Sequence, residues 1–395
     1  MNQIRVLHIV FSLAGGAGSV VKSIQEYQKG YLKKVDIESI SEKNSYFEKL
    51  KHPVIYIFSM IDNYIIRKSK TKIFFSIFRS KLNPSNLYNF LDYENLHLHW
   101  TPGILNLVRN KYIHEKKIVL HLHDMWFLTG GCHFSGNCKQ YITGCKDCPF
   151  VKKSFKKIIR NEAKIKKDFV EKNNVELIAP STRLYNIAKT SYIAKNANII
   201  YLPNPSSKIK YRDITKNRAR KKIKVTEKSF LIGFIAMNLN EERKNIGEFY
   251  KLLHILNKKY QFFDIKGVTC GKGKILDSNL DITNLGFVTD ELSKFYFYKA
   301  IDVLFMPSID ENLPVVIQDS IKYGVPTVIN ILSSENRREF AGDNVYYYKN
   351  FEDLNRIFSY EVIHKIKLKK INKSLPINQN NLQIVKKIND LYVKK

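Results

Sequence analysis

The sequence MPSIDENLPVVIQDSIKYGVPTVI, from Met306 to Ile329, places a short acidic loop between two apolar runs. The run that ends at Met306 and the run Val325–Ile329 are typical of buried strands, and Pro314–Tyr323 between them is typical of a helix. A strand, a helix and a strand in this order predict a parallel βαβ unit. Glu311 would then lie at the carboxyl end of the first strand, and Asp319, eight residues later, on the helix.

The same alternation runs through the whole chain. The expected strands of the first half are Val6–Phe11, Val54–Phe58, Asn95–His99, Ile118–His123, Leu177–Ala179 and Ile199–Leu202. In the second half we expect strands at Phe230–Ala236, Phe263–Thr269, Ile301–Met306 and Val325–Ile329, and helices at Ile246–Asn257, Asp290–Lys299 and Pro314–Tyr323. The pattern predicts an α/β fold with two Rossmann-like, doubly wound domains that face a deep interdomain cleft.

A polar and basic stretch that contains Pro203 and Pro205 separates the two halves and is the best candidate for a hinge. The length of 395 residues also favours two domains. We expect residues 1–203 to form an N-terminal domain and residues 204–377 to form a C-terminal domain. A helix at about 378–395 is expected to pack back on the first domain.

The chain is strongly basic, with 66 Lys and Arg against 36 Asp and Glu and a formal net charge of +30. Such a charge attracts nucleic acid, anionic lipid or phosphorylated small molecules, although an AT-rich genome would also enrich lysine. Residues 61–82 interleave basic residues with Ile and Phe, and would either lie on an anionic membrane or pack on their own domain.

No signal peptide and no stretch of about 18 apolar residues is evident in the sequence. These features predict a cytoplasmic protein with reduced cysteines. The basic surface favours a location at the inner face of the plasma membrane.

Glycines and histidines follow the expected strands of the first domain. Gly15 and Gly16 open a helix after the first strand, where they form either a plain tight turn or an anion contact, but the dinucleotide-binding fingerprint is incomplete. His97, His99 and His123 lie near strand ends, where ligands meet α/β sheets. We favour His123 as a functional residue and expect a structural hydrogen bond at His97.

Four cysteines follow His123 with the spacing C-x5-C-x6-C-x2-C, at Cys132, Cys138, Cys145 and Cys148. Four thiolates in one short loop are typical of a tetrahedral structural zinc site, and the alternative is four free thiols. A catalytic metal is not expected here.

Arg243 and Lys244 follow the first expected strand of the second domain and precede a helix. Adjacent basic residues are often a solvated surface pair. At the carboxyl end of a strand and the N-terminus of a helix, however, they are also placed to neutralise a diphosphate.

These motifs resemble a known family. The run LGFVTDELSKFYFYKAIDVLFMPSIDENLPVVIQDSIKYGVPTVI is similar to the donor-binding core of glycosyltransferase family 4, which has the GT-B fold, and Glu-Arg-Lys at 242–244 matches its phosphate-contact position. The run HLHDMWFLTGGCHFSGNCKQYITGCKDCPF resembles a bacterial subgroup that builds exopolysaccharide, capsule or lipopolysaccharide, including colanic-acid-type transferases.

The resemblance implies a role for each matching residue. Glu311 would contact the hydroxyls of the donor sugar, with Asn312 and Leu313 in the same donor-binding loop. Asp319 stands where a second Glu usually holds the nucleotide ribose, and its shorter side chain is a departure from the family. Arg243 and Lys244 would bind the donor diphosphate, with Asn245 where glycine is common. In the first domain, His123 would face the transferred sugar, and Gly15 and Gly16 would lie near the acceptor and phosphates.

The implied reaction is the retaining transfer of a sugar from a UDP- or GDP-sugar to a lipid-linked, polyprenyl-diphosphate saccharide. His123 and Glu311 would be the catalytic residues, and cations would stabilise the departing diphosphate without a catalytic metal or other cofactor. The alternatives are a GT-B nucleotide-sugar epimerase, a basic nucleic-acid-binding protein and a nicotinamide-dependent dehydrogenase. We expect no nucleic-acid partner, because no nucleic-acid-binding module is recognised in the sequence.

Overall fold

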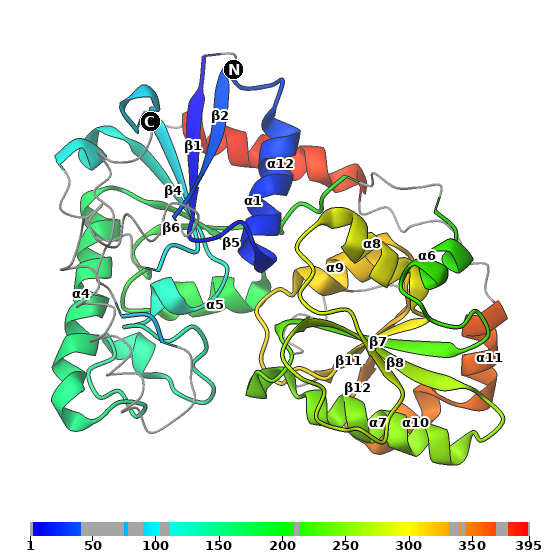
Figure 1. The fold of residues 1–395 in the computed structure, drawn as a ribbon. Helices are drawn as coiled ribbons and strands as arrows, with labels where there is room; N and C mark the ends of the chain where they lie inside the picture. Colours follow the sequence, from blue (N-terminus) through cyan, green and yellow to red (C-terminus); the bar gives the residue numbers. More distant parts are fainter. Residues whose placement is uncertain are drawn as a thin grey trace, which may run out of the picture. The chain divides into compact units, whose positions relative to one another are not determined.

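The computed structural model describes residues 3–40, 75–77, 90–102, 111–208, 214–331, 340, 344–368 and 378–393. The chain divides into two compact units. The first comprises Met1–Ser207 together with Asn380–Lys395, and the second comprises Lys208–Gln379. Each unit is built on its own parallel sheet, with helices on both faces (Figure 1).

The first unit holds a six-stranded parallel sheet in the order β2-β1-β3-β4-β5-β6. Its strands are β1 (Arg5–Val10), β2 (Lys34–Ser39), β3 (Asn95–His99), β4 (Lys117–His121), β5 (Glu176–Ala179) and β6 (Asn198–Tyr201). Its α-helices are α1 (Gly15–Gln28), α4 (Lys156–Lys172), α5 (Thr182–Thr190) and α12 (Asn378–Val393).

The two faces of this first sheet differ in chemistry. One face carries apolar side chains such as Ile9, Leu98 and Leu120, which form a core with residues of α4 and α5. The other face carries histidines and is joined by hydrogen bonds to α1 and α12, which lie side by side (Figure 1). A polar layer therefore runs through the inside of this unit.

The glycine turn before α1 is sterically constrained. Gly15 has a φ of 85°, in the left-handed region that favours glycine. A Cβ atom built on Gly18 would lie 2.3 Å from the carbonyl oxygen of Leu13, so the helix can approach the turn this closely only with glycine there. The structure thus gives Gly18, in the first turn of α1, a packing role.

The second unit holds a six-stranded parallel sheet in the order β12-β11-β10-β7-β8-β9. Its strands are β7 (Phe230–Asn238), β8 (Ile265–Lys272), β9 (Ile282–Asn284), β10 (Val303–Met306), β11 (Thr327–Asn330) and β12 (Val345–Tyr348). Its α-helices are α6 (Lys216–Lys222), α7 (Ile246–Lys259), α8 (Glu291–Ala300), α9 (Val315–Lys322), α10 (Phe351–Ile357) and α11 (Tyr360–Leu368).

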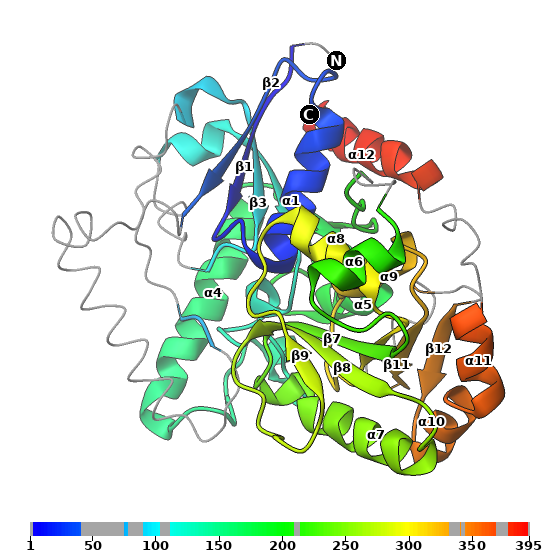
Figure 2. The ribbon, with the colours of Figure 1, turned by 45° about the vertical axis from the view of Figure 1, so that its right-hand side comes forward.

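Apolar cores cover both faces of the second sheet. Helices α7, α10 and α11 pack on one face around Phe234, Phe249 and Phe305. Helices α8 and α9 cover the other face, where Leu304 and Met306 belong to separate clusters. Figure 2 shows α8 and α9 on the opposite side of the strands from α7. Burial on both faces explains why the central strands read as continuous apolar runs.

The predicted α/β fold with two parallel sheets is confirmed. The helix predicted to begin at Pro314 begins at Val315, with Pro314 as its N-cap. The expected strand Val54–Phe58 lies outside the described residues, as does segment 61–82 except for residues 75–77. No helix in the described ranges combines the length and the apolar character needed to cross a bilayer.

Candidate functional site

Arg243 and Lys244 lie in a short 3-10 turn, Glu242–Lys244, between the end of β7 and the start of α7. Glu311 lies in the loop between β10 and α9, and β10 is the neighbour of β7 in the sheet. The two strands end at the same edge because they are parallel. Residues far apart in sequence therefore meet at one point.

The meeting point is a buried charge cluster. Lys244 donates a hydrogen bond to Glu311 Oε1, and Arg243 Nη1 lies 3.0 Å from the same oxygen. Arg243 also donates through Nε to Glu241 Oε1 at 2.5 Å and through Nη1 to the carbonyl of Asp310 at 3.1 Å. The Glu311 side chain is only 7% exposed.

The cluster fixes the charge of its members. Burial raises the pKa of Glu311, but the charges of Lys244 and Arg243 oppose it and leave the pKa below its ordinary value. Burial lowers the pKa of Lys244 more than Glu311 raises it, and the net pKa is below the ordinary value. Arg243 and Lys244 thus share the carboxylate of Glu311, and Arg243 also pairs with the partly exposed Glu241. An anionic ligand that displaces these carboxylates would meet two adjacent cations.

Asn245 supports this cluster through its backbone. It has a φ of 55°, a left-handed conformation that asparagine tolerates better than most residues. Its side-chain amide donates to Glu248 Oε2 at 2.7 Å and to the carbonyl of Pro307 at 3.4 Å. Asn245 therefore turns the chain from the basic pair into α7 and ties that turn to the loop after β10.

The remaining donor-site candidates of this unit differ in their surroundings. Asn312 is buried directly after Glu311, whereas the side chain of Leu313 packs into an apolar cluster with Met306 and Ile317. Leu313 is thus a core residue whose side chain contributes to packing.

Asp319 lies on α9 and is half-buried. Burial raises its pKa, and the nearby charges of Lys322 and Lys294 oppose this only in part. Glu311 has its partners on the turn before α7, whereas Asp319 has its electrostatic neighbours on α8 and α9. The two carboxylates therefore occupy different environments and do not form an acid/base couple.

In the first unit, His123 follows β4 and belongs to a polar group at the carboxyl ends of β3 and β4. His123 Nε2 lies 3.1 Å from His99 Nδ1. Asp124 Oδ2 accepts from Trp100 Nε1 at 2.7 Å and lies 2.6 Å from His133 Nδ1. A small pocket is lined by Trp100, His123 and Asp124, among others. Because His123 Nε2 is engaged, Nδ1 is the ring nitrogen left for a ligand.

Trp100 is held in an unusual backbone conformation, with a φ of 29°. Such a conformation costs energy in a non-glycine residue and is often found beside functional sites. Trp100, Asp124 and His133 were missed by the sequence analysis. The run HLHD placed Asp124 next to His123, but nothing in the sequence pairs it with His133.

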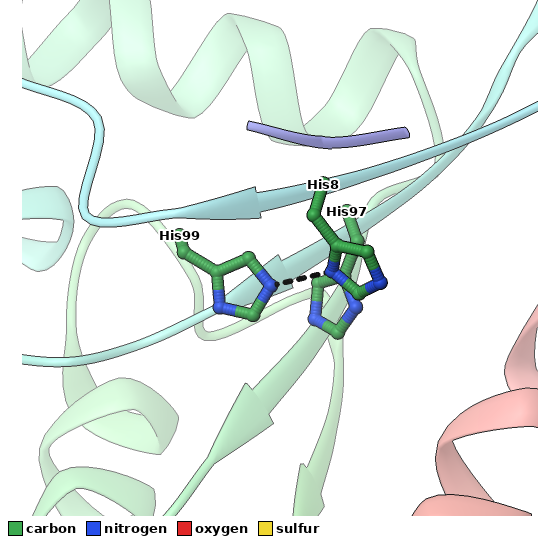
Figure 3. Close-up of side chains that lie close together, drawn as sticks. All are labelled: His8, His97 and His99. Carbon is green, nitrogen blue, oxygen red and sulfur yellow. Dashed lines mark hydrogen bonds between the residues drawn. The ribbon is translucent and has the colours of Figure 1, made fainter. Parts of the chain in front are cut away.

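His123 is also the outer end of a stack of buried histidines. His8 Nδ1 lies 3.0 Å from His99 Nε2 (Figure 3). His8 Nε2 lies 2.8 Å from the side-chain oxygen of Gln28. His97 and His121 stack beside them, with ring centroids 5.5 Å apart. His97 Nδ1 lies 2.7 Å from the hydroxyl of Tyr392, which places it in the hydrogen-bonding role expected for it.

Burial lowers the pKa of every ring in the stack, to about 4 for His8 and His121. The rings are therefore neutral at physiological pH.

Within the described residues, His8, His97 and His99 are the group whose possible ligand atoms lie within 4.8 Å of one another. The groups hydrogen-bonded to the trio are an amide, a phenol and another imidazole. None of these carries a negative charge, so a divalent ion would be buried without charge compensation. We therefore interpret the trio as a hydrogen-bonded stack that orients His123.

Gly15 and Gly16 form the first residues of α1. Ala14 is the N-cap, and its amide donates to the hydroxyl of Ser12 at 3.1 Å. No side chain caps the start of this helix. The glycines therefore open a helix N-terminus next to the end of β1, a geometry that suits an anion.

The four cysteines of the loop after β4 line one small cavity. Cys132, Cys145 and Cys148 are buried and Cys138 is partly exposed, and all four are free thiols. Phe75 and Ile77 pack against the three buried cysteines. Residues 75–77 of the basic segment therefore pack on their own unit.

Comparison with known proteins identifies the class of fold. The chain superimposes over 99% of its length on sucrose-phosphate synthase from Thermosynechococcus elongatus, covering 98% of that chain, with a TM-score of 0.58 and 11% identity. It also superimposes over 98% of its length on the whole of Anabaena Alr3699/HepE in complex with UDP and glucose, with a TM-score of 0.55 and 13% identity. The fold is the GT-B fold.

The sequence also matches a curated relative over part of its length. Over 255 residues it is 22% identical to the colanic acid biosynthesis glycosyl transferase WcaC of Escherichia coli strain K12, a match that includes 60% of this chain. The match spans 58% of the length of that relative. No protein-family profile matches the chain.

Proposed function

We propose that this protein is a retaining glycosyltransferase of family 4 that moves a sugar from a UDP- or GDP-sugar to a lipid-linked saccharide in bacterial surface polysaccharide biosynthesis. The observation that carries the proposal is the cluster of Arg243, Lys244 and Glu311 at the carboxyl ends of adjacent strands in a GT-B fold. Two cations and a sugar-binding carboxylate are the groups that a nucleotide sugar requires.

The donor assignment rests on charge and geometry. Arg243 and Lys244 precede α7, whose N-terminal amides add a partial positive charge. The Anabaena protein with the same fold binds UDP and glucose, which supports a nucleotide-sugar ligand here. Glu311 would hold the hydroxyls of the sugar, Asn312 would lie beside it, and Asp319 would reach toward the ribose.

The chemistry follows from the same groups. In the transfer step the bond between the anomeric carbon and the donor phosphate breaks, and the acceptor oxygen bonds to that carbon. The acceptor proton passes to the departing phosphate, so no second catalytic carboxylate is required. Arg243 and Lys244 would stabilise the negative charge that develops on the diphosphate, without a catalytic metal. Positioning by Glu311 would contribute several kcal/mol.

The first unit would contribute to the reaction through His123, Gly15 and Gly16. His123 Nδ1 is suited to hydrogen bonding with a hydroxyl of the transferred sugar, because its Nε2 is engaged by His99. The start of α1 at Gly15 and Gly16 would approach phosphate or acceptor.

The acceptor proposal rests on the net charge of +30, which favours an anionic membrane surface and a polyprenyl-diphosphate carrier. The relative WcaC, named for colanic acid biosynthesis, supports a role in exopolysaccharide, capsule or lipopolysaccharide assembly at the inner face of the plasma membrane.

Donor binding and hydrolysis with a panel of UDP- and GDP-sugars test this proposal. We expect one or two donors to bind and to hydrolyse slowly without acceptor, and Glu311→Ala to lose both properties. Absence of binding to every donor, or identical behaviour of Glu311→Ala, would refute the transferase. Conversion of the donor into an epimer without acceptor would assign an epimerase. Mass spectrometry of lipid-linked saccharides in a deletion strain would then identify the missing sugar.

A further inference from the structure

The cysteine loop is a compact structure that the proposed transfer reaction does not use. Cys138 and Cys145 flank a 3-10 turn, Gln140–Thr143, after which the chain reverses through left-handed conformations at Gly144 and Cys145. The four cysteine side chains line the same cavity although they span seventeen positions of sequence. The fold of the loop therefore gathers four soft ligands of one type.

Backbone amides are directed at the sulfurs. Gly130 N donates to Cys145 Sγ at 3.2 Å, and Gln140 N donates to Cys138 Sγ at 3.5 Å. The amides of Phe150 and Val151 act in the same way on Cys148. A thiolate accepts such hydrogen bonds far better than a neutral thiol does, so this arrangement suits deprotonated sulfurs.

A buried cation lies beside the cavity. Lys166 is fully buried, and its ammonium group donates to the carbonyls of Trp126 at 2.6 Å and Thr129 at 2.8 Å. A metal ion bound by four thiolates carries a net negative charge, which Lys166 would offset.

We propose that Cys132, Cys138, Cys145 and Cys148 bind one structural zinc ion, and that this ion fixes the loop that holds the polar group next to His123. The cysteine loop is directly connected to this polar group. Thr129 Oγ1 donates to the carbonyl of Cys132 at 2.7 Å, and the next residue after Cys132 is His133, which contacts Asp124. The zinc site would thus act through loop geometry, and the ion would take no part in the transfer.

Zinc binding requires the four sulfurs to move closer together. No three of the four sulfurs lie within 4.8 Å of one another, whereas zinc–sulfur bonds of about 2.3 Å in a tetrahedron place sulfurs about 3.8 Å apart. Cys138 is partly exposed, whereas the other three cysteines pack in the apolar cluster with Phe75 and Ile77. Because no three sulfurs are close enough, at least one of the buried sulfurs must move together with Cys138. Zinc should therefore rigidify the segment around Cys138.

The test is the metal content of the purified full-length protein, measured by elemental mass spectrometry for the wild type, Cys138→Ser, Cys145→Ser and Cys270→Ser. Cys270 is the matched control, because it is a buried cysteine of β8 in the other unit. We expect one zinc per chain in the wild type and in Cys270→Ser, and loss of zinc in the two loop variants. Cobalt in place of zinc should give the intense thiolate-to-metal absorption of a site with four cysteine ligands, and Cys138→Ser should weaken that band.

A second measurement does not require the variants to fold. A thiol reagent added to the native wild type should release one zinc as the loop cysteines react, and hydrogen exchange around Cys138 should then accelerate while the amides of β8 stay protected. The proposal is overturned if the protein contains no zinc and does not take up cobalt through thiolates. Equal zinc in Cys138→Ser and Cys270→Ser, or a disulfide within the loop, would also overturn it. Each result is independent of donor binding, so failure of the zinc site would leave the proposed transferase untouched.

Discussion

Lys244 donates a hydrogen bond to Glu311 across 67 positions of sequence, and the accepting oxygen is also the one that lies 3.0 Å from Arg243 Nη1. One buried carboxylate oxygen therefore contacts both cations, while Glu241 supplies a second negative charge to Arg243. A donor diphosphate would bring new negative charge to the same cations and would release Glu311 to contact the sugar. The cluster is thus preorganised for an anion, and its parts can be separated by substitution.

Glu311→Gln should affect two ligands in opposite directions. Because the amide keeps the shape of the side chain but removes its charge, Arg243 and Lys244 become more available to phosphate. We expect affinity for the free nucleoside diphosphate to hold or rise, while affinity for the nucleotide sugar falls by about tenfold or more, as the loss of a charged hydrogen bond implies. Calorimetric titration with both ligands measures this. Equal weakening of both ligands would instead assign Glu311 to the architecture of the basic pair.

Lys244→Met should destabilise the protein by about 3 kcal/mol, because it leaves the buried Glu311 with only one counter-charge. Combining it with Glu311→Met should cost less than the sum of the two single substitutions, since neither charge is then left without its partner. Urea unfolding of the four proteins gives the coupling energy. Arg5→Ala at the exposed pair Arg5–Glu94 is the control and should change stability little. Strict additivity at Lys244 and Glu311 would contradict the expected coupling.

Asn245→Ala should lower stability by about 1 to 2 kcal/mol, because alanine is strained at a φ of 55° and loses the hydrogen bonds to Glu248 and Pro307. Asn245→Gly should cost less. Gly247→Ala, two residues further on, should stabilise the protein by about 0.5 to 1 kcal/mol, because the added methyl group meets no atom within 4 Å in a helix. Thermal unfolding of the three variants checks the order. An equal loss for Asn245→Ala and Asn245→Gly would show that the left-handed conformation is not the cause.

The histidine stack predicts a loss of stability on acidification. In the unfolded chain a histidine binds a proton below about pH 6.5, whereas burial keeps His8 and His121 neutral down to a pKa of about 4. The unfolded state therefore binds more protons between these limits, and the free energy of unfolding falls as the pH falls from 6.5 to 4. Each of these two histidines lowers the free energy of unfolding by on the order of 1 kcal/mol for each pH unit of acidification in this range.

Urea unfolding between pH 7.5 and pH 5 measures this effect above the range in which most carboxylates titrate. His121→Gln should make the slope shallower, because the glutamine amide extends about as far as histidine Nε2 and can still donate to Asn204 but does not titrate. A stability that stays constant from pH 7.5 to pH 5 would contradict neutral burial of the stack.

The sequence predicted the central strands of both sheets, because these strands are buried on both faces and read as apolar runs. It missed β2 (Lys34–Ser39), β9 (Ile282–Asn284) and β12 (Val345–Tyr348) for the converse reason, since they are edge strands and carry polar or partly exposed residues. The boundaries of α9 differed by one residue, which is the usual uncertainty of helix ends.

The sequence predicted the individual strand ends that carry site residues, but it did not predict which of these strand ends lie next to each other. A strand–helix pattern places Arg243 and Glu311 at carboxyl ends, but only the sheet order shows that β7 and β10 are neighbours. The histidine stack needed the strand register, which pairs His8 with His97 and His99 with His121. No local pattern contains that register, and so His8 and His121 were not considered as neighbours of His123.

Helix α12 has a consequence for how the molecule is made. Tyr392 and Asn389 complete the hydrogen bonds of Gln28 and His97, yet the ribosome adds them only after the entire second unit. Domains usually fold in the order of their synthesis. Here the first unit cannot complete its polar layer until α12 has been translated, after the second unit. A pause or premature stop in translation of the second unit would therefore leave the histidine face exposed to chaperones and proteases.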